Sequence, residues 1–288
     1  MLQSESTGML KNCETRFSND QTNNENSAES MIRGLCDEVV RLQRDMTLMR
    51  VQTRFAMNAL ESAMKPDERF CPVCETVSPK FVPHGVAQRL EAKCPCCGAL
   101  ERHRLMWLFI QSETNLFRDP LRFLHFAPEK GLLPHFRKCE NLDYVTVDIE
   151  PGRADYAMDI QNLGFPDNSF DALLCSHVLE HIPDDRRATR ELLRVLKPGG
   201  WALIAVPINH TYDVTYEDPN VKTIEDRIKH YGHPEHLRWY GKDVAKRLME
   251  DGFEVSVNTD FANCLEANLR RRMNVNSEWF FLCRKPRR

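Results

Sequence analysis

The sequence lacks any long apolar run, and its net charge is close to zero. The longest apolar stretches are too short to cross a bilayer, and the N-terminus MLQSESTGML has no basic region followed by an apolar core. We therefore expect a cytoplasmic protein that is not held in a membrane. The formal net charge of −3 and the pI near 6.4 argue against a protein built for non-specific nucleic-acid binding.

Apolar periodicity is missing from residues 1–30, which are rich in Ser, Asn, Gln, Glu and Thr. Such a segment buries too little apolar surface to fold, so we predict a disordered tail. The full length of 288 residues exceeds the usual size of one domain. We therefore expect one large domain with smaller modules attached to it.

Residues 31–66 show a heptad pattern that Pro66 ends. β-branched residues at the first a positions and Leu at the first d positions favour a parallel two-stranded coiled coil, and hence a homodimer. The alternative is a single amphipathic helix that lies on the catalytic domain. The apolar seam, in steps of three and four, comprises Ile32, Leu35, Val39, Leu42, Met46, Met49, Thr53, Ala56, Leu60 and Ala63.

Eleven cysteines are many for a cytoplasmic chain, where disulfides are rare, so clustered cysteines indicate a metal. Residues 67–105 contain Cys71-Pro-Val-Cys74, nineteen further residues, and Cys94-Pro-Cys-Cys97. Two CxxC pairs at this spacing predict a four-cysteine zinc site, and four protein ligands make its role structural. Cys96 is either a spare thiol or a ligand that exchanges with Cys94 or Cys97.

Two roles for this zinc module stay open. In the first, the zinc ties the linker to a helix predicted over Ala99–Gln111 and helps to shape one wall of the active site. In the second, the module is a zinc ribbon that binds nucleic acid. Its basic face would then consist of Arg89, Lys93, Arg102, His103 and Arg104.

The stretch from Phe170 to Pro207 predicts a strand, a helix and a second strand, which together form a βαβ unit of a parallel sheet. Asp184 and Asp185 suit the positive end of the helix. We expect Arg194 and Lys197 in its last turn, before a stop at Pro198-Gly199-Gly200. The two strands are expected over Asp171–Cys175 and Trp201–Val206. Further strands are expected over Leu121–Phe126, Tyr144–Ile149, 253–257 and Glu278–Cys283, and a helix over Val244–Met249.

The motifs FDxxxCxHVLEHIxD and ExxRVLKPGGxxxxxVP resemble the second half of class I S-adenosylmethionine (SAM) dependent methyltransferases of type 11. The resemblance covers roughly residues 121–285. It implies a Rossmann-like, mostly parallel seven-stranded sheet with helices on both faces over residues 106–288. It also implies an enzyme that transfers a methyl group from SAM.

The resemblance places the cofactor at a loop that departs from the family's pattern. Where the family has an acidic residue and GxGxG, this chain has FAPEKG, which is similar to the loop of a zinc-bearing subgroup of these methyltransferases. Here Ala127 is small, Gly131 is the one glycine, and Glu129 is expected to meet the ammonium group or the ribose of SAM. The alternative is a loop that binds no cofactor.

Two further motifs resemble cofactor-binding motifs of the family. Asp148 ends the strand whose acidic residue accepts hydrogen bonds from both ribose hydroxyls, with Glu150 as the substitute if the register differs. In DxxxLxFxDxSFD, Asp159 would accept from the adenine amino group while Ile160 packs on the ring. Ser176, in the loop that faces the transferred methyl, completes the expected set.

The methyl acceptor is indicated less directly. The signature Asn/Asp-Pro-Pro-Tyr/Phe, which is the best sequence marker of methylation at a nucleic-acid base nitrogen, is absent after the fourth strand. Its absence counts against that reaction. Residues 209–240 are dense in histidine and aromatic residues, which suits a lid over a polar acceptor, and GHPEHLRWYGKD resembles a GxxDHxRxYG signature of the same subgroup.

Removing a proton from a hydroxyl acceptor needs a base, for which His177, His210 and His236 are candidates. His177 is alternatively a group that orients the acceptor or caps the strand. A second metal site at His233 and His236 is a further alternative, but the sequence offers no third ligand at a suitable spacing. Because the subgroup is met among bacterial surface-glycan enzymes, a sugar or other hydroxyl is the first expectation. An RNA methyltransferase and a non-catalytic scaffold are the alternatives.

Overall fold

The computed structural model describes residues 31–54, 68–85 and 88–287. The chain divides into two compact units, Met1–Arg50 and Val51–Arg288. Residues 31–54 are helical, as the heptad pattern predicts, while the rest of the predicted coil and the predicted disordered tail lie outside the described residues. Apolar side chains of the seam are more than half exposed, among them Ile32, Leu35, Val39, Leu42, Met46 and Met49.

The second unit is built on a seven-stranded sheet with the order β10-β11-β9-β8-β5-β6-β7. Four of its six strand pairs are parallel, and β11 runs antiparallel to both of its neighbours. This confirms the predicted Rossmann-like, mostly parallel sheet. The strands are β5 Leu121–Phe126, β6 Leu142–Asp148, β7 Tyr156–Ala157, β8 Phe170–Ser176, β9 Leu196–Ala205, β10 Glu254–Asn258 and β11 Phe280–Arg284.

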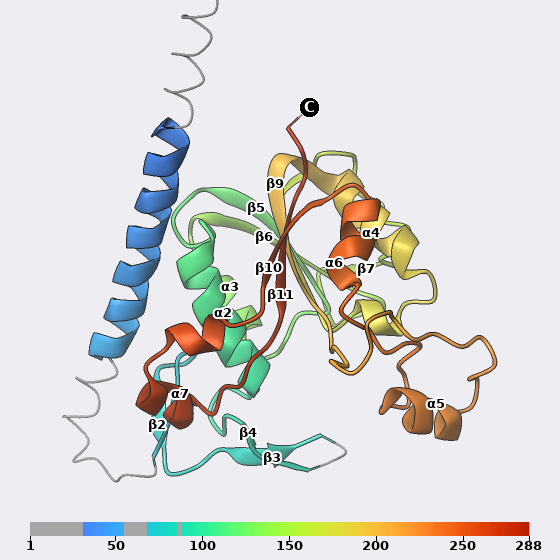
Figure 1. Cartoon of the computed structure of the whole chain (residues 1–288), viewed down its shortest axis with the longest axis horizontal. Coiled ribbons are helices and arrows are strands. Elements are labelled where there is room, and N and C mark those ends of the chain that lie inside the picture. The colour runs from blue at the N-terminus through green and yellow to red at the C-terminus, as the bar shows by residue number, and fades with distance from the viewer. Residues whose placement is uncertain (1–30, 55–67, 86–87, 288) are drawn as a thin grey trace, which may run out of the picture. The chain divides into compact units, whose positions relative to one another are not determined.

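Helices cover both faces of this sheet, with α2 and α3 on one side and α4 and α6 on the other (Figure 1). The sheet core is continuous from β6 to β11, because the central strands are apolar on both faces. No helix among the described residues is long and apolar enough to span a membrane. The helices are α2 Glu101–Glu113, α3 Leu133–Phe136, α4 Asp185–Val195, α5 Ile224–Tyr231, α6 Val244–Glu250 and α7 Ala267–Met273.

The junction between α4 and β9 corrects one expectation. The helix begins as predicted, since the Asp184 carboxylate accepts from the Arg187 backbone N–H at 2.8 Å. However, α4 ends at Val195, and the chain is already extended at Leu196, so the placement of Lys197 in the last helical turn is wrong. Instead, Lys197 donates to Asp171 at 2.8 Å across an irregular step in the β8–β9 ladder.

The residues Pro198-Gly199-Gly200 therefore belong to a strand, and the expected start of that strand at Trp201 is also corrected. Gly199 has the left-handed φ of 78° that the pattern suggested. Gly200 is needed for another reason, because a Cβ there would lie 2.8 Å from the Asp171 carbonyl oxygen. The close approach of β9 to β8 requires a residue without a side chain at this point.

Candidate active site and metal centres

The order of the strands reverses between β5 and β8, and ligands of open parallel sheets bind beyond the carboxyl ends of the strands at such a reversal. A cavity of about 480 Å³ lies there. The first residues after the two strands, Ala127 and His177, have left-handed φ values of 45° and 52°. Non-glycine residues in this conformation store strain of about 1 kcal/mol or more and cluster at functional sites.

Four of the seven predicted cofactor residues line this cavity: Ala127, Asp148, Asp159 and Ile160. Asp148 Oδ1 accepts from the Glu150 backbone N–H at 2.9 Å, which fixes the carboxylate at the end of β6. Glu150, the predicted substitute, also lines the cavity. The cavity therefore has an acidic group at one strand end and the apolar Ile160 in the same wall, which suits a ribose beside an aromatic base.

The other three predicted cofactor residues lie elsewhere, so their contact with a cofactor stays a prediction. Ser176 is buried at the end of β8. Glu129 Oε2 lies 2.7 Å from His125 Nε2, and His125 Nδ1 lies 2.8 Å from the Tyr144 hydroxyl. Burial disfavours the Glu129 carboxylate, but the charge and the hydrogen bond of His125 outweigh this and lower the pKa of Glu129 to about 2.

Gly131 allows the loop Ala127–Gly131 to pack closely against the cysteine module. A Cβ at this position would lie 2.9 Å from the Ala99 backbone nitrogen and 3.2 Å from the Cys97 carbonyl oxygen. Together with Glu129, it lines a second cavity that the cysteine turn also lines. The module therefore packs against this loop, while its role in shaping a wall of the active site stays a prediction.

The four predicted zinc ligands come together. The Sγ atoms of Cys71 and Cys97 are 3.6 Å apart, and those of Cys74 and Cys94 are 3.8 Å apart. All four lie within 4.8 Å of one another. Tetrahedral Zn–S bonds of about 2.3 Å place sulfur atoms about 3.8 Å apart, so this set fits zinc. Cys96 is exposed and is not part of the cluster.

Two short hairpins carry these ligands. They consist of β1 Arg69–Cys71 with β2 Thr76–Ser78, and β3 Val82–His84 with β4 Arg89–Lys93. The Cys94 turn closes with a hydrogen bond from the Gly98 backbone N–H to the Cys94 oxygen at 3.0 Å. Gly98 has φ 80°, as expected at the end of such a turn.

Two of the five residues of the basic face expected under the nucleic-acid alternative are buried, and a third forms an ion pair. Arg104 is completely buried, and its guanidinium donates to the Ala92 and Ala99 carbonyl oxygens at 3.0 and 2.8 Å. His103 is also buried, and Arg89 forms an ion pair with Glu101 at 3.2 Å. These side chains hold the module to α2, because a buried guanidinium must find carbonyl or carboxylate acceptors.

His177 lies in the wall of the first cavity between two acidic groups. Its ring nitrogens are 3.3 Å from Glu180 Oε1 and 3.4 Å from Glu278 Oε1. Burial opposes the charged form, but the two carboxylates outweigh it and raise the pKa of His177 to about 9. A histidine that is protonated at neutral pH is better suited to act as a fixed positive charge than as a general base.

Glu180 and Glu278 were not predicted as site residues. Glu180 is only three residues after His177, so its closeness in sequence was an available signal. Glu278 lies about a hundred residues further along, so only the pairing of β11 with β9 brings it to the site.

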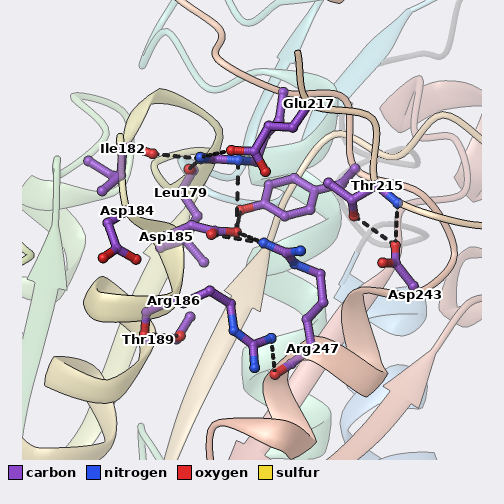
Figure 2. A network of polar contacts seen from close by, with 12 residues as sticks. Leu179, Ile182, Asp184, Asp185, Arg186, Thr189, Thr215, Glu217, Asp243 and Arg247 are labelled. Carbon is purple, nitrogen blue, oxygen red and sulfur yellow. Dashed lines mark hydrogen bonds and ion pairs between the residues drawn. The ribbon is translucent and has the colours of Figure 1, made fainter. Parts of the chain in front are cut away.

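Residues 209–240 form a structured segment that includes α5 rather than a plain loop. Arg238 is 1% exposed and donates to the carbonyl oxygens of Leu179 and Ile182 at 2.8 and 2.6 Å. Its remaining acceptors include Glu217 at 2.7 Å. Figure 2 shows this network, in which Asp185 at the start of α4 also accepts from Arg247.

Of the other two predicted bases, His210 is exposed, and its ring centroid lies 5.2 Å from that of Trp279. His236 packs edge-on against His181, with the ring centroids 4.9 Å apart. Burial lowers the pKa of His236 to about 4, so its imidazole is neutral at pH 7. The structure does not bring these two residues to the lining of the first cavity, although His181 and Glu235 are part of it.

Comparisons with known proteins agree with the resemblance at the level of a domain. Residues 132–204 match the family model described as the methyltransferase domain. The uncharacterized methyltransferase YcgJ of Bacillus subtilis (strain 168) is 35% identical over 113 residues, which is 39% of this chain and 35% of that protein. An uncharacterized methyltransferase of Mycobacterium sp. (strain KMS) is 30% identical over 105 residues, 34% of this chain and 41% of that protein.

This chain therefore spans well under half the length of these two curated relatives. Among solved structures, the [4+2]-cyclase SpnF matches 75% of this chain and 91% of its own, at 16% identity and a TM-score of 0.48. The Bacillus subtilis YcgJ structure matches 64% of this chain and 99% of its own, at 16% identity and a TM-score of 0.42.

Proposed function

We propose that this chain is a SAM-dependent methyltransferase that transfers a methyl group to a heteroatom of its acceptor, in the first place a sugar or other hydroxyl. The observation that carries the proposal is the cavity at the sheet reversal, which Asp148, Asp159 and Ile160 all line. The matched methyltransferase domain, residues 132–204, contains all three. SAM would supply an activated methyl on a sulfonium, and the protein would contribute mainly alignment.

Calorimetry with SAM on the full-length, zinc-loaded protein tests the proposal. We expect micromolar binding that Asp148→Ala abolishes, because the carboxylate at the end of β6 would lose both of its ribose hydrogen bonds. Asp143→Asn is a matched control on the same strand, since its side chain is 66% exposed and pairs with Arg122. Absence of binding by the unaltered protein would refute the proposal.

The acceptor class needs a transfer assay. Radiolabelled methyl from SAM, incubated with fractionated cell extract, is expected to appear in the glycan or small-molecule fraction. Label in RNA would favour the alternative of an RNA methyltransferase, and filter binding across salt concentrations would then show a steep slope. The buried Arg104 and His103 count against that alternative, because they remove two of the five residues of the basic face it needs. Label in no fraction, together with SAM binding, would point to a scaffold.

We also propose that the four cysteines hold a structural zinc ion. Their spacing in sequence and the sulfur–sulfur distances support this, and four thiolates leave no position for a substrate. The module packs on the loop that follows β5, so chelation is expected to loosen that loop as well as the module itself.

The N-terminal helix is proposed to join two copies of the chain in a parallel coiled coil. Support comes from the heptad pattern of the sequence and from seam side chains such as Ile32 and Leu35, which are 58% and 60% exposed. A second copy is the partner that offers the same apolar seam in the same register.

A further inference from the structure

Three histidines from two separate segments converge beside the first cavity. His181 ends the short helix η1, Leu179–His181, and His233 and His236 follow α5. The ring centroid of His236 lies 4.9 Å from that of His181 and 4.5 Å from that of His233. One ring nitrogen of each residue lies within 4.8 Å of the others. We propose that this histidine trio binds a divalent transition-metal ion, Zn²⁺ in the first place, with one coordination position left open.

The two segments that supply the trio are held in fixed positions. The Leu237 backbone N–H donates to the Glu180 carbonyl oxygen at 2.8 Å, next to both His236 and His181. The buried Arg238 guanidinium bonds the carbonyl oxygens of Leu179 and Ile182, on either side of His181. The trio therefore rests on two segments that are joined by hydrogen bonds of the backbone and of a buried side chain, which is the support that a selective site needs.

The chemistry of the trio matches a borderline metal rather than magnesium or calcium, since imidazole nitrogen is a preferred ligand of zinc, copper, nickel and iron. Tetrahedral Zn–N bonds of about 2.0–2.1 Å place ligand nitrogens about 3.3 Å apart, so modest ring rotations would close the site. His236 Nδ1 is buried and has no hydrogen-bond partner within the described ranges. A buried nitrogen lone pair without a donor is a group that a metal ion satisfies.

A negative charge close to the trio favours a cation there. Glu180 precedes His181 and is completely buried, with its nearest cationic partner, His177, 3.3 Å away. Buried acidic groups around metal-bound histidines raise the basicity of the ligands and help to neutralise the ion. Glu235, between the other two histidines, lines the first cavity.

The trio lies beside the cavity that the proposed function assigns to the cofactor, which the acceptor must approach to receive the methyl group. His181 lines the first cavity together with His177, so an ion on the trio would stand at its edge. Three protein ligands leave a fourth position for water or a substrate oxygen, and a bound ion lowers the pKa of that oxygen. This role rests on the proposed function: the acceptor O–H proton passes to water, the oxygen forms the new O–C bond, and the C–S bond of the sulfonium breaks to leave a neutral thioether.

Metal content tests the site itself. The full-length protein, equilibrated with micromolar free Zn²⁺ and separated from it by gel filtration, is expected to hold one equivalent more than the His181→Ala/His236→Ala variant. The control is His210→Ala/His230→Ala, which removes two histidines of the same segment outside the trio and is expected to hold as much metal as the unaltered protein. Equal metal content in the unaltered protein and the trio variant would overturn the proposal.

Cobalt substitution distinguishes this site from the four cysteines. Thiolate-bound Co²⁺ gives intense sulfur-to-metal charge-transfer bands, whereas a site of three histidines gives only weak visible bands. The trio variant is expected to keep the thiolate bands and lose the weak ones. If the double variant does not fold, His233→Gln takes its place, since that side chain lies on the surface segment after α5; undiminished cobalt binding by it would overturn the proposal.

The result does not depend on the proposed function. SAM calorimetry is run on the same samples, and SAM binding without the extra metal would leave the methyltransferase standing and refute the trio. The extra metal without SAM binding would leave the trio standing and refute the methyltransferase.

Discussion

Replacing Asp185 by Asn removes the charge at the centre of the network that holds residues 209–240 to α4. Asp185 is 5% exposed and accepts from the Tyr240 hydroxyl and from Arg247, both at 2.7 Å, while Arg238 Nε lies 3.9 Å away. Asparagine keeps the volume but leaves the Arg247 guanidinium without its carboxylate, whereas Arg238 keeps its ion pair with Glu217. Breaking a buried ion pair on one side costs about 3–5 kcal/mol. Because the Arg247 side chain is 24% exposed, we expect about 3 kcal/mol.

Urea unfolding measures this loss as a lower midpoint with an unchanged slope. For a folded unit of this size, about 3 kcal/mol lowers Tm by roughly 6–12 °C. The control is Asp213→Asn, which breaks an exposed ion pair with Lys242 and is expected to cost about 0.5 kcal/mol or less. A cost for Asp185→Asn no greater than that of the control would refute the reasoning.

The pH dependence of the same variant follows from linkage. Burial raises the pKa of Asp185, but Arg238, Tyr240 and Arg247 outweigh it, so the folded pKa lies below its ordinary value. A depressed pKa gives stability that is present above the unfolded pKa and lost as pH falls through the folded pKa. The difference between the unaltered protein and Asp185→Asn is therefore expected to shrink in acid.

Three further predictions concern other parts of the chain. The pKa of His177 is raised to about 9, so the stability it contributes is present below about pH 6.5 and lost as pH rises to 9. The free energy of unfolding in urea should therefore fall by up to about 3 kcal/mol in that window for the unaltered protein and should not fall for His177→Gln. Gly131→Ala should lower the free energy of unfolding by about 1–3 kcal/mol, because the new Cβ would meet backbone atoms. In the control Gly164→Ala, the nearest atom to the new Cβ is a side-chain atom at 3.5 Å, so the loss should be smaller. Equal losses of stability in the two variants would contradict this prediction. Light scattering should report a dimer that Leu35→Asp converts to a monomer and that Thr47→Asp, away from the seam, leaves intact; a monomeric unaltered chain would refute the coiled coil.

The sheet could be predicted because its strands are short apolar runs with clear boundaries. The strand Leu121–Phe126 is found as predicted, since burial on both faces leaves a continuous apolar run between polar turns. The helices α5 and α7 were not predicted. Helix α5 carries apolar residues at helical spacing, Ile224, Ile228 and Tyr231, but it is only eight residues long, so the pattern covers little more than two turns.

The candidate site was predictable where ligands are close in sequence and much less so elsewhere. The ligands of the cysteine site can be identified from the two CxxC pairs, because two short turns bring four thiolates together in many folds. In the histidine trio only His233 and His236 are close in sequence, and the third member, His181, ends the short helix η1 more than fifty residues earlier. The buried Arg238 joins the segment of His233 and His236 to the segment of His181, because its guanidinium donates to the Leu179 carbonyl oxygen. The residues around Arg238 in the sequence do not indicate this contact.

The loop Ala127–Gly131 shows how a cofactor site can keep its shape with few glycines. In a glycine-rich loop, backbone freedom lets the chain turn sharply and approach the cofactor. Here Ala127 takes a left-handed φ of 45°, and its backbone N–H donates to the Val147 oxygen at 2.7 Å, which ties the loop to the end of β6. The His125 ring nitrogen Nε2 forms a hydrogen bond with the Glu129 carboxylate, and Gly131 packs against the cysteine turn. The strain at Ala127 persists because these contacts over-determine the loop, and the cysteine module supplies one of them through Gly131.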